Sequence, residues 1–272
     1  MKQEVININD FRQLVPFFNT PVGYRVLKFL FSITGIGKVN RAYKNSCSYK
    51  GTEFTAHLLK ELGASYCINN GEELDKLPKG TFITVSNHPY GGLDGIILIH
   101  ILAAHRKDFK VMVNWILGYA EAMSEHFICV DPTPSSVNGR NINGFKQTMN
   151  HIRDGHPMGF FPAGAVSDFN SRFRIEDREW QPTVLRLIKS SRCPIIPIYF
   201  HKHNSIFFHS LGLLHWKLRM LRLPRELFNK KGKPIEVTIG QPIAVDVQDN
   251  YKDIAEFGQF LKDETYKLNK KQ

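Results

Sequence analysis

Short β-prone runs alternate with helical patterns from residue 81 to residue 239, and this alternation constrains the fold more than any other feature. The expected strands, all rich in Val, Ile or Phe, are Thr81–Ser86, Phe109–Val113, Phe127–Val130, Met158–Phe161, Ile195–Phe200 and Ile235–Ile239. The expected helices between them are Asp94–His105, Trp115–Met123, Ile142–Arg153 and Thr183–Lys189. Because parallel strands need long and usually helical crossovers, this order predicts an α/β fold with a mixed, largely parallel sheet covered by helices.

The N-terminal part of the chain is basic and apolar. No Asp or Glu occurs from Phe11 to Thr52, where Arg and Lys alternate with Phe, Tyr and Leu. One or two amphipathic helices are expected between Asp10 and Tyr43, broken near Pro21 and at Gly35 and Gly37. A short helix over Thr52–Leu62 should end at Gly63. We predict that residues 1–50 form an amphipathic helical segment that docks on a membrane and that residues 51–272 form the main domain.

A second stretch without acids runs from Trp180 to Arg225 and contains FFHSLGLLHWKLRMLRLPR. Large apolar residues mixed with Lys and Arg suit the lipid headgroup boundary, although a core helix with a solvated basic face has the same pattern. The net charge of +11 attracts anionic lipid, acidic carrier proteins or nucleic acid without choosing among them. Two such stretches in one chain favour an anionic membrane surface.

The spacing of the cysteines and the length of the apolar runs predict a cytoplasmic protein. The four cysteines have no disulfide-like or zinc-like spacing, and the N-terminal MKQEVININDF lacks the basic and apolar regions of a signal peptide. The most apolar run, Gly95–Ala104, is shorter than the roughly 20 residues that cross a bilayer. We therefore expect a cytoplasmic protein, peripheral on the inner face of the cell membrane, with no metal and no nucleotide cofactor.

The segment TFITVSNHPYGGLDGIILIHIL carries the most specific chemistry. His88 lies in a loop at the carboxyl end of an expected strand, and Asp94 lies where an N-cap would begin the next helix. A carboxylate bonded to one imidazole nitrogen leaves the other nitrogen free to act as a general base. Such a pair can deprotonate a substrate hydroxyl without an enzymic serine. The alternative is structural: His88 caps a turn and Asp94 only caps a helix.

Further segments decide between these readings. The Asn-His followed by Asp resembles motif I of the lysophospholipid and glycerolipid acyltransferase family. FICVDP with Arg140 downstream, GFFPAGAVS and CPIIPIYF resemble the second, third and fourth blocks of that family, in its order. The resemblance covers Thr81 to Phe200. It implies an O-acyltransferase of membrane lipid biosynthesis that moves a fatty acyl group from acyl-CoA or acyl carrier protein to a lysolipid hydroxyl. His88 would be the general base and Asp94 would orient it.

The sequence departs from the family pattern at two points. Five residues separate His88 from Asp94 instead of the usual four, and the adjacent Gly91 and Gly92 could absorb the extra residue. Ala163 replaces the glutamate of the third block. FPAGAVS, IEDREW and YFHKHNSIFF resemble a subgroup related to enzymes of amino-acid lipid synthesis, often labelled hemolysin-like. A lyso-aminolipid acceptor is therefore as credible as lysophosphatidate.

Several residues are expected to bind substrate. For a phosphate on the acceptor, Arg140 is the first candidate, followed by Lys110, Arg172 and Arg174, although the last two could instead form surface ion pairs. The turn Pro162-Ala163-Gly164 follows a strand and could present N–H groups to an oxyanion, or be structural. The complete expected set is Asn87, Gly91, Gly92, Lys110, Arg140, Pro162, Ala163, Gly164, Arg172, Arg174, Asp177 and Trp180. Asp177 and Trp180 belong to this set because they match the Asp-x-x-Trp pattern of the subgroup that the sequence resembles.

Two other functions remain open at this point. The same fold could direct its base at water, which would make the protein a lipid thioesterase or hydrolase. A non-catalytic basic protein that binds membranes or nucleic acid would explain the charge, but not the four ordered blocks. Because no nucleic-acid-binding motif is present, we expect no nucleic-acid partner.

Overall fold

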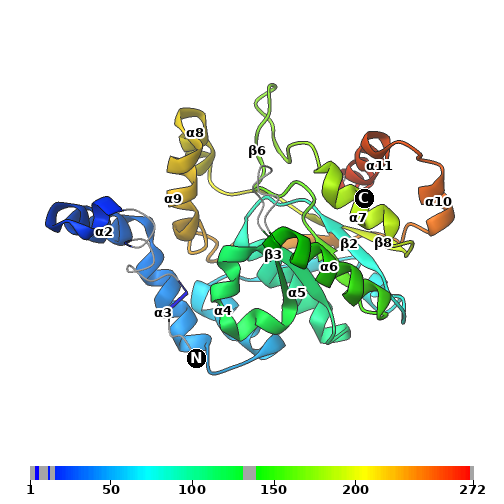
Figure 1. Ribbon diagram of the computed structural model, residues 1–272, viewed down its shortest axis with the longest axis horizontal. Coiled ribbons are helices and arrows are strands. Elements are labelled where there is room, and N and C mark those ends of the chain that lie inside the picture. The colour runs from blue at the N-terminus through cyan, green and yellow to red at the C-terminus, as the bar shows by residue number, and fades with distance from the viewer. Residues whose placement is uncertain (1–3, 6–11, 13–15, 131–138, 270–272) are drawn as a thin grey trace.

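The computed structural model describes residues 4, 5, 12, 16–130 and 139–269. Within these residues, seven strands form one sheet in the order β1-β9-β8-β2-β5-β3-β4 (Figure 1). They are β1 (Tyr66–Asn69), β2 (Ile83–Ser86), β3 (Lys110–Asn114), β4 (Phe127–Val130), β5 (Met158–Phe160), β8 (Ile195–Phe200) and β9 (Ile235–Ile239). All neighbouring strands are parallel except β8 and β9. The predicted mixed, largely parallel sheet is therefore confirmed.

Helices cover both faces of the sheet. On one face, α4 (Gly51–Leu62) and α5 (Gly92–His105) enclose a core with Phe82, Val111 and Ile198, to which α3 (Ile36–Ser46) also contributes. On the other face, α6 (Gly139–Arg153), α7 (Pro182–Ser190) and α11 (Ile254–Lys267) cover Ile83, Val85 and Phe160. Since neighbouring strand residues point to opposite faces, strands buried on both sides need apolar residues at nearly every position.

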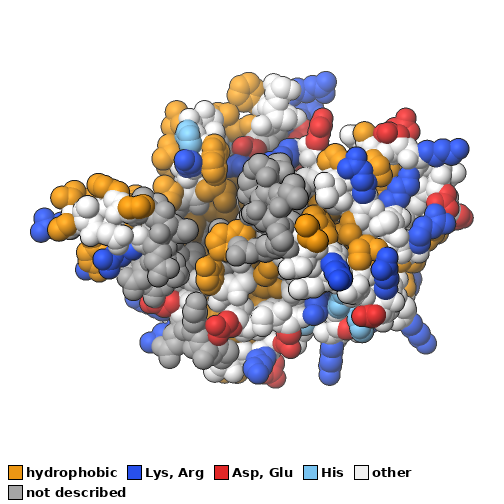
Figure 2. Space-filling model, in the orientation of Figure 1, with side chains coloured by type: hydrophobic (Ala, Val, Ile, Leu, Met, Phe, Trp, Pro, Cys, Tyr) orange, Lys and Arg blue, Asp and Glu red, His pale blue; other side chains and the backbone are white. Residues whose placement is uncertain are grey.

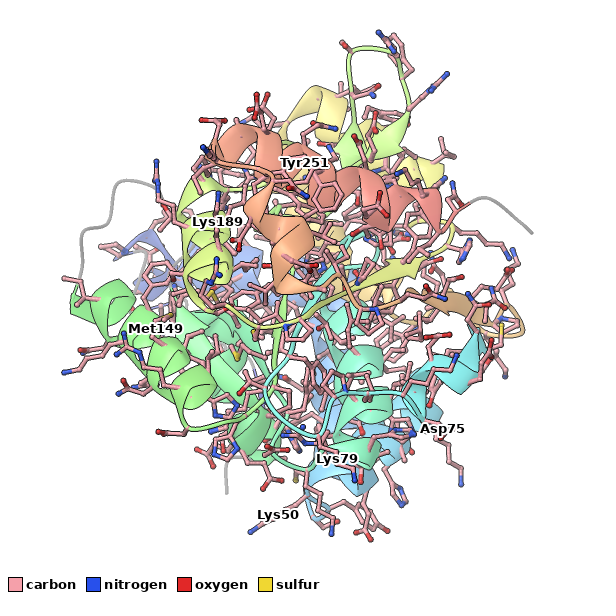
Figure 3. All side chains as sticks on the ribbon, turned by 90° about the vertical axis from the view of Figure 1, so that its right-hand side faces the viewer. Lys50, Asp75, Lys79, Met149, Lys189 and Tyr251 are labelled. Carbon is pink, nitrogen blue, oxygen red and sulfur yellow. The ribbon has the colours of Figure 1, made fainter. Side chains whose placement is uncertain are left out.

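The C-terminal helix packs closely on α7. A Cβ on Gly258 of α11 would lie 2.3 Å from Leu185 of α7, so glycine is required for the two helices to approach this closely. Figure 3 views this side of the molecule, where Lys189 of α7 lies near Tyr251. The Lys189 ammonium donates hydrogen bonds to the main-chain carbonyls of Tyr251 and Lys252, between the short helix α10 (Val245–Asp249) and α11.

Most deviations from the predicted elements lie in short or irregular segments. The helix expected over Trp115–Met123 is two 3-10 helices, η3 (Trp115–Tyr119) and η4 (Glu121–His126), separated at Ala120. Gly118, a poor helix former, lies inside η3. The sequence did not reveal β1 or the two-residue strands β6 (Asp168–Phe169) and β7 (Ile175–Glu176), which pair as a hairpin. Such short strands carry too few residues for a clear alternation. A further 3-10 helix, η2, spans Gly71–Leu74.

The N-terminal helices follow the prediction in part. After η1 (Pro16–Asn19), α2 (Pro21–Thr34) and α3 meet at Gly35, whose φ of +85° turns the chain. The break at Gly35 is thus confirmed, whereas the break expected at Gly37 is wrong because Gly37 lies inside α3. Pro21 begins α2, where its missing N–H costs nothing. The helix α4 ends at Gly63 as predicted, with a φ of +65°.

Two further helices, α8 (Ile206–Leu214) and α9 (Trp216–Glu226), form a hairpin that stands beside the sheet with α2 at its side (Figure 1). The Ser205 hydroxyl caps α8 by accepting the Phe208 N–H, and the His215 imidazole caps α9 by accepting the Lys217 N–H. Among the described residues, each helix is too short or too polar to cross a bilayer.

Candidate active site

His88 follows the carboxyl end of the central strand β2. The preceding Asn87 is buried, and its side chain joins β2 to β8: Oδ1 accepts the Phe200 N–H at 2.7 Å and Nδ2 donates to the Phe200 carbonyl at 2.9 Å. Both polar groups of Asn87 therefore bond to main chain rather than facing substrate. This pair of bonds fixes the point from which the His88 loop leaves the sheet.

Asp94 lies in the buried first turn of α5, six residues after His88. The sequence placed Asp94 at the N-cap, but the structure corrects this: Gly91 is the N-cap, with a φ of +79°, and Asp94 is the third helical residue. From there, Asp94 Oδ2 accepts the N–H groups of Tyr90 and Gly91, both at 2.9 Å. A carboxylate at this position satisfies donors that a helix start leaves unpaired.

The five-residue spacing brings the two side chains together. His88 Nδ1 lies 3.0 Å from Asp94 Oδ2, with 18% of the imidazole side chain exposed and the carboxylate completely buried. The distance is that of a hydrogen bond, but Nδ1 has no aligned hydrogen bond to any described residue. Catalytic pairs commonly align only when substrate is bound. Burial raises the pKa of the Asp94 carboxyl, and the contacts with His88, Tyr90 and Gly91 oppose that rise.

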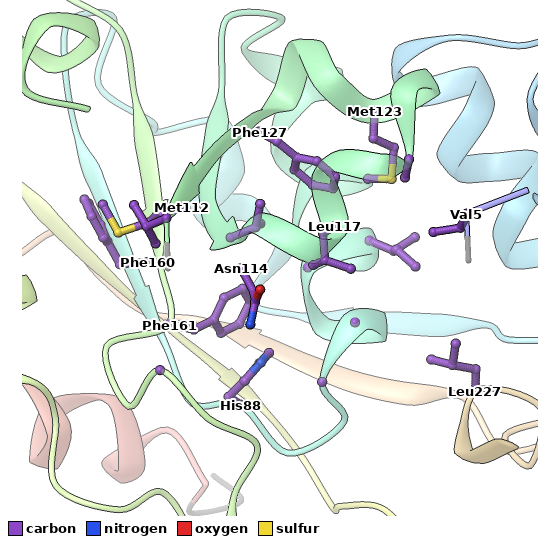
Figure 4. Close-up of a pocket in the computed structure, with 18 of the residues that line it drawn as sticks. Val5, His88, Met112, Asn114, Leu117, Met123, Phe127, Phe160, Phe161 and Leu227 are labelled. Carbon is purple, nitrogen blue, oxygen red and sulfur yellow. The ribbon is translucent and has the colours of Figure 1, made fainter. Parts of the chain in front are cut away.

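An apolar cavity of about 260 Å³ adjoins the imidazole. The Phe161 and His88 rings lie 4.4 Å apart between centroids. Figure 4 shows His88, Phe161 and Asn114 close together, with Val5 and Leu227 at the opposite end. The lining residues further include Gly91, Gly92 and Gly95 at the start of α5, Met112 and Phe160 on strands, and Leu117, Met123 and Phe127. The His88 imidazole thus borders space that suits an apolar chain.

The third sequence block forms part of the rim of the cavity. Gly164 lines the cavity, but its N–H donates to the Phe161 carbonyl at 2.9 Å. Pro162 has no N–H, and Ala163 is fully buried with its carbonyl accepting Arg178 Nε at 2.8 Å. Of the two N–H groups in this turn, that of Ala163 donates no hydrogen bond to a described residue.

Asp177 and Trp180 lie behind His88 and do not line the cavity. Both side chains are buried, and Asp177 Oδ1 accepts the main-chain N–H of His88 at 3.1 Å. The Trp180 indole donates to Asp177 Oδ2 at 3.2 Å. The structure therefore connects these two residues to the main chain of the His88 loop.

The expected phosphate ligands are not gathered at the cavity. Lys110 is the first residue of β3 and pairs in register with Met158, so it lies at the amino edge of the sheet, opposite His88. Arg172 and Arg174 are exposed in the β6–β7 turn. Asp168, an acid close to them in the sequence, pairs with Arg219 at 2.6 Å. The Arg140 side chain lies outside the described residues, although its main chain belongs to α6.

Sequence reasoning missed several residues around His88. Asn114 ends β3 and lines the cavity, so the rule that sites follow strand ends could have identified it. Phe161, Ser167 and Gln181 gave no such signal, because their positions depend on how distant segments fold together. Within the described residues, no three His, Cys, Asp or Glu side chains group as a metal site.

The fold and the site define an α/β protein with a histidine–carboxylate pair beside an apolar cavity, an arrangement that can deprotonate a hydroxyl next to a bound acyl chain. The family model described as acyltransferase matches residues 22–272, and the chain belongs to this acyltransferase family. The resemblance to an acyltransferase family is therefore confirmed.

Two named relatives cover most of the chain. The lyso-glycine lipid O-acyltransferase of Phocaeicola vulgatus is 30% identical, over 89% of this chain and 87% of the relative. The lyso-glycine lipid O-acyltransferase of Bacteroides thetaiotaomicron is 29% identical over 89% of each chain. The crystal structure of the 1-acyl-sn-glycerophosphate (LPA) acyltransferase PlsC from Thermotoga maritima aligns with a TM-score of 0.48 and 12% identity, covering 96% of this chain and 92% of that one.

Proposed function

We propose that this acyltransferase moves a fatty acyl group from a thioester, acyl-CoA or acyl carrier protein, to the hydroxyl of a lysolipid, with His88 as general base. The observation that carries the proposal is the partly exposed imidazole at the cavity wall, 3.0 Å from the buried Asp94 carboxylate. The names of the two relatives favour a lyso-glycine lipid as the acceptor over lysophosphatidate.

The proposed reaction uses the two imidazole nitrogens differently. Nδ1 faces Asp94, which leaves Nε2 to take the proton of the acceptor hydroxyl. The hydroxyl oxygen attacks the thioester carbonyl and forms a tetrahedral intermediate. When the carbon–sulfur bond breaks, the thiolate takes the proton from the imidazolium, so the products are the acylated lipid and a free thiol. Asp94 orients the ring and stabilises its positive charge.

The apolar cavity would hold an acyl chain. Gly95 lies one turn into α5 and lines the cavity, and a Cβ there would have Phe161 as its nearest contact, at 4.0 Å. A larger side chain at residue 95 would therefore extend into the cavity beside His88 rather than clash with main chain.

Gly95→Leu is expected to reduce transfer of long acyl chains by at least about tenfold, because the loss of several buried methylenes at about 0.8 kcal/mol each weakens chain binding. Short-chain donors should be affected less. The melting temperature should stay the same or rise, since leucine is the better helix former. A series of donors of increasing chain length measures the effect. Gly37→Leu in α3, where a Cβ meets nothing within 4 Å, is the matched control. Equal losses for all chain lengths would contradict this use of the cavity.

A docking surface would bring the enzyme to its lipid substrate. We define it by exposed apolar side chains on three helices: Val22, Val26, Phe29 and Ile33 of α2, Ile206, Phe207, Leu213 and Leu214 of α8, and Trp216, Leu218, Met220 and Leu221 of α9. Exposed apolar side chains are visible on α2 and along the α8–α9 hairpin in Figure 2. Arg25, Lys28 and Lys217 are exposed among them. Apolar and basic side chains together suit an anionic membrane, here the inner face of the cell membrane.

The triple variant Phe207→Ser, Leu214→Ser and Trp216→Ser is expected to bind anionic vesicles at least about 100-fold more weakly, because each buried side chain of this size contributes about 1.5–3 kcal/mol. Sedimentation with vesicles that contain anionic lipid measures this. Ile142→Ser is the control that should leave vesicle binding unchanged, because Ile142 is an exposed apolar residue of α6, outside the docking surface. Vesicle binding equal to that of the unmodified protein would exclude the hairpin from the docking surface.

One assay separates acyl transfer from hydrolysis. Purified protein is incubated with a labelled acyl donor, with and without a lyso-glycine lipid, and the products are separated. Acyl transfer yields labelled diacylated lipid that requires the acceptor, whereas a thioesterase releases free fatty acid even when acceptor is abundant. Absence of labelled lipid with every lysolipid tested would refute the proposed function.

A further inference from the structure

We propose that Asp177 is a positioning residue for His88, holding the main chain of the catalytic histidine while Asp94 contacts its ring. The inference rests on the proposed function, because it assigns a role in fixing the general base. It differs from the substrate-binding role expected from the sequence, since Asp177 is 3% exposed and does not line the cavity.

Both main-chain groups of His88 are held by one small cluster. The His88 N–H donates to Asp177 Oδ1 at 3.1 Å, and the His88 carbonyl accepts the Ser167 N–H at 2.9 Å. The Ser167 hydroxyl in turn donates to Asp177 Oδ1 at 2.6 Å. Asp177 and Ser167 thus form a closed ring of hydrogen bonds with the histidine backbone, which fixes its position in the loop.

The chemistry of this cluster calls for a carboxylate at residue 177. Three donors converge on the side chain: the His88 N–H, the Ser167 hydroxyl and the Trp180 indole N–H. An ionised carboxyl group only accepts hydrogen bonds, so it satisfies all three, whereas an amide would turn a donor toward one of them. Burial raises the pKa of Asp177, and the bonds from Ser167, His88 and Trp180 oppose this by stabilising the charged form.

The cluster is anchored to the helical layer opposite Asp94. The Asp177 N–H donates to the Tyr266 hydroxyl at 2.7 Å, and Lys262 Nζ donates to the Asp177 carbonyl at 2.7 Å. Tyr266 and Lys262 belong to α11 on the other face of the sheet from α5. The position of His88 is thereby set from two independent directions.

The test compares Asp177→Ala with the double variant Asp177→Asn, Trp180→Phe. Alanine removes the acceptor for the His88 N–H, and a catalytic group displaced by about 1 Å can lose about 100-fold in rate. Asparagine keeps an oxygen for His88 and Ser167, and phenylalanine removes the indole donor that the asparagine NH2 would face. We expect Asp177→Ala to lower kcat by about 10- to 100-fold with KM nearly unchanged. The double variant should recover kcat to within about fivefold of the unmodified enzyme.

Trp180→Phe alone is the reference for the double variant, because it removes the same indole donor while keeping the Asp177 carboxylate. Thermal unfolding reports how much of each variant is folded, and kcat is expressed per folded enzyme. A folded Asp177→Ala protein with unmodified kcat, or a double variant as impaired as Asp177→Ala, would overturn the positioning role. Failure of the proposed function is distinct, because the unmodified enzyme would then acylate no lysolipid. If Asp177→Ala does not fold, the double variant decides: recovered kcat supports the proposal and a 10-fold or greater loss overturns it.

Discussion

Replacing His88 by alanine is expected to lower kcat for acyl transfer by about 100- to 10,000-fold, the range that a general base contributes. The imidazole borders the cavity with 18% of its side chain exposed, so it is accessible to the acceptor hydroxyl. Without it, the hydroxyl has no base in this position and remains a weak nucleophile. KM for the acyl donor should change by less than about twofold, because the chain binds to apolar residues that the substitution leaves in place.

The measurement is the initial rate of labelled acyl incorporation into lysolipid, at saturating donor and acceptor. His105→Ala is the matched control: His105 ends the same helix α5, is exposed, and contacts the Ile101 carbonyl at 3.0 Å. This control should retain the full rate. Acyl transfer by His88→Ala at the rate of the control would eliminate His88 as the base.

Asp94→Ala is expected to reduce both rate and stability. It removes the carboxylate 3.0 Å from His88 Nδ1, which we expect to cost about 100-fold or more in kcat, as loss of an orienting group does in related dyads. It also leaves the N–H groups of Tyr90 and Gly91 without their acceptor at the start of α5. An unsatisfied buried donor costs about 1–3 kcal/mol, so the melting temperature should fall by several degrees.

Asp94→Asn separates orientation from charge. Its amide oxygen can replace Oδ2 and keep the two main-chain N–H bonds, while the amide nitrogen takes the place of Oδ1, for which no described residue is a partner. Because this nitrogen would be a buried donor without an acceptor, we expect both the stability and kcat to lie between those of the unmodified enzyme and Asp94→Ala. Thermal unfolding and steady-state kinetics of both variants measure this. Asp94→Ala with full kcat would show that the carboxylate has no part in the reaction.

The sequence predicted the elements that have a clear local pattern of apolar residues. Strands such as Ile195–Phe200 are continuous apolar runs because both faces of the sheet are covered, and the structure has this strand at the predicted residues. His88 and Asp94 were found because they are close in sequence and lie on a recognisable strand–loop–helix segment. The exact cap was missed because Asp94 and Gly91 both suit a helix start, and only the loop geometry decides between them.

Residues that meet through tertiary packing could not be predicted. The cavity joins Tyr43 and Leu58 of the N-terminal half to Gln181 and Leu227, and no local pattern links these four positions. Lys110 was misplaced because it was chosen for its charge, although the expected strand Phe109–Val113 already had it near its amino end. The contacts of Asp177 could not be predicted either, because its partners His88 and Tyr266 are each 89 residues away in the sequence.

Gly91 shows how narrowly the loop between β2 and α5 is constrained. Its φ of +79° disfavours any side chain, and a Cβ would lie 3.1 Å from Val166 and 3.2 Å from Leu223 of α9. Both the backbone torsion and the lack of space therefore favour glycine at residue 91. A substitution at residue 91 would therefore disturb the loop between β2 and α5 without altering the His88 or Asp94 side chain.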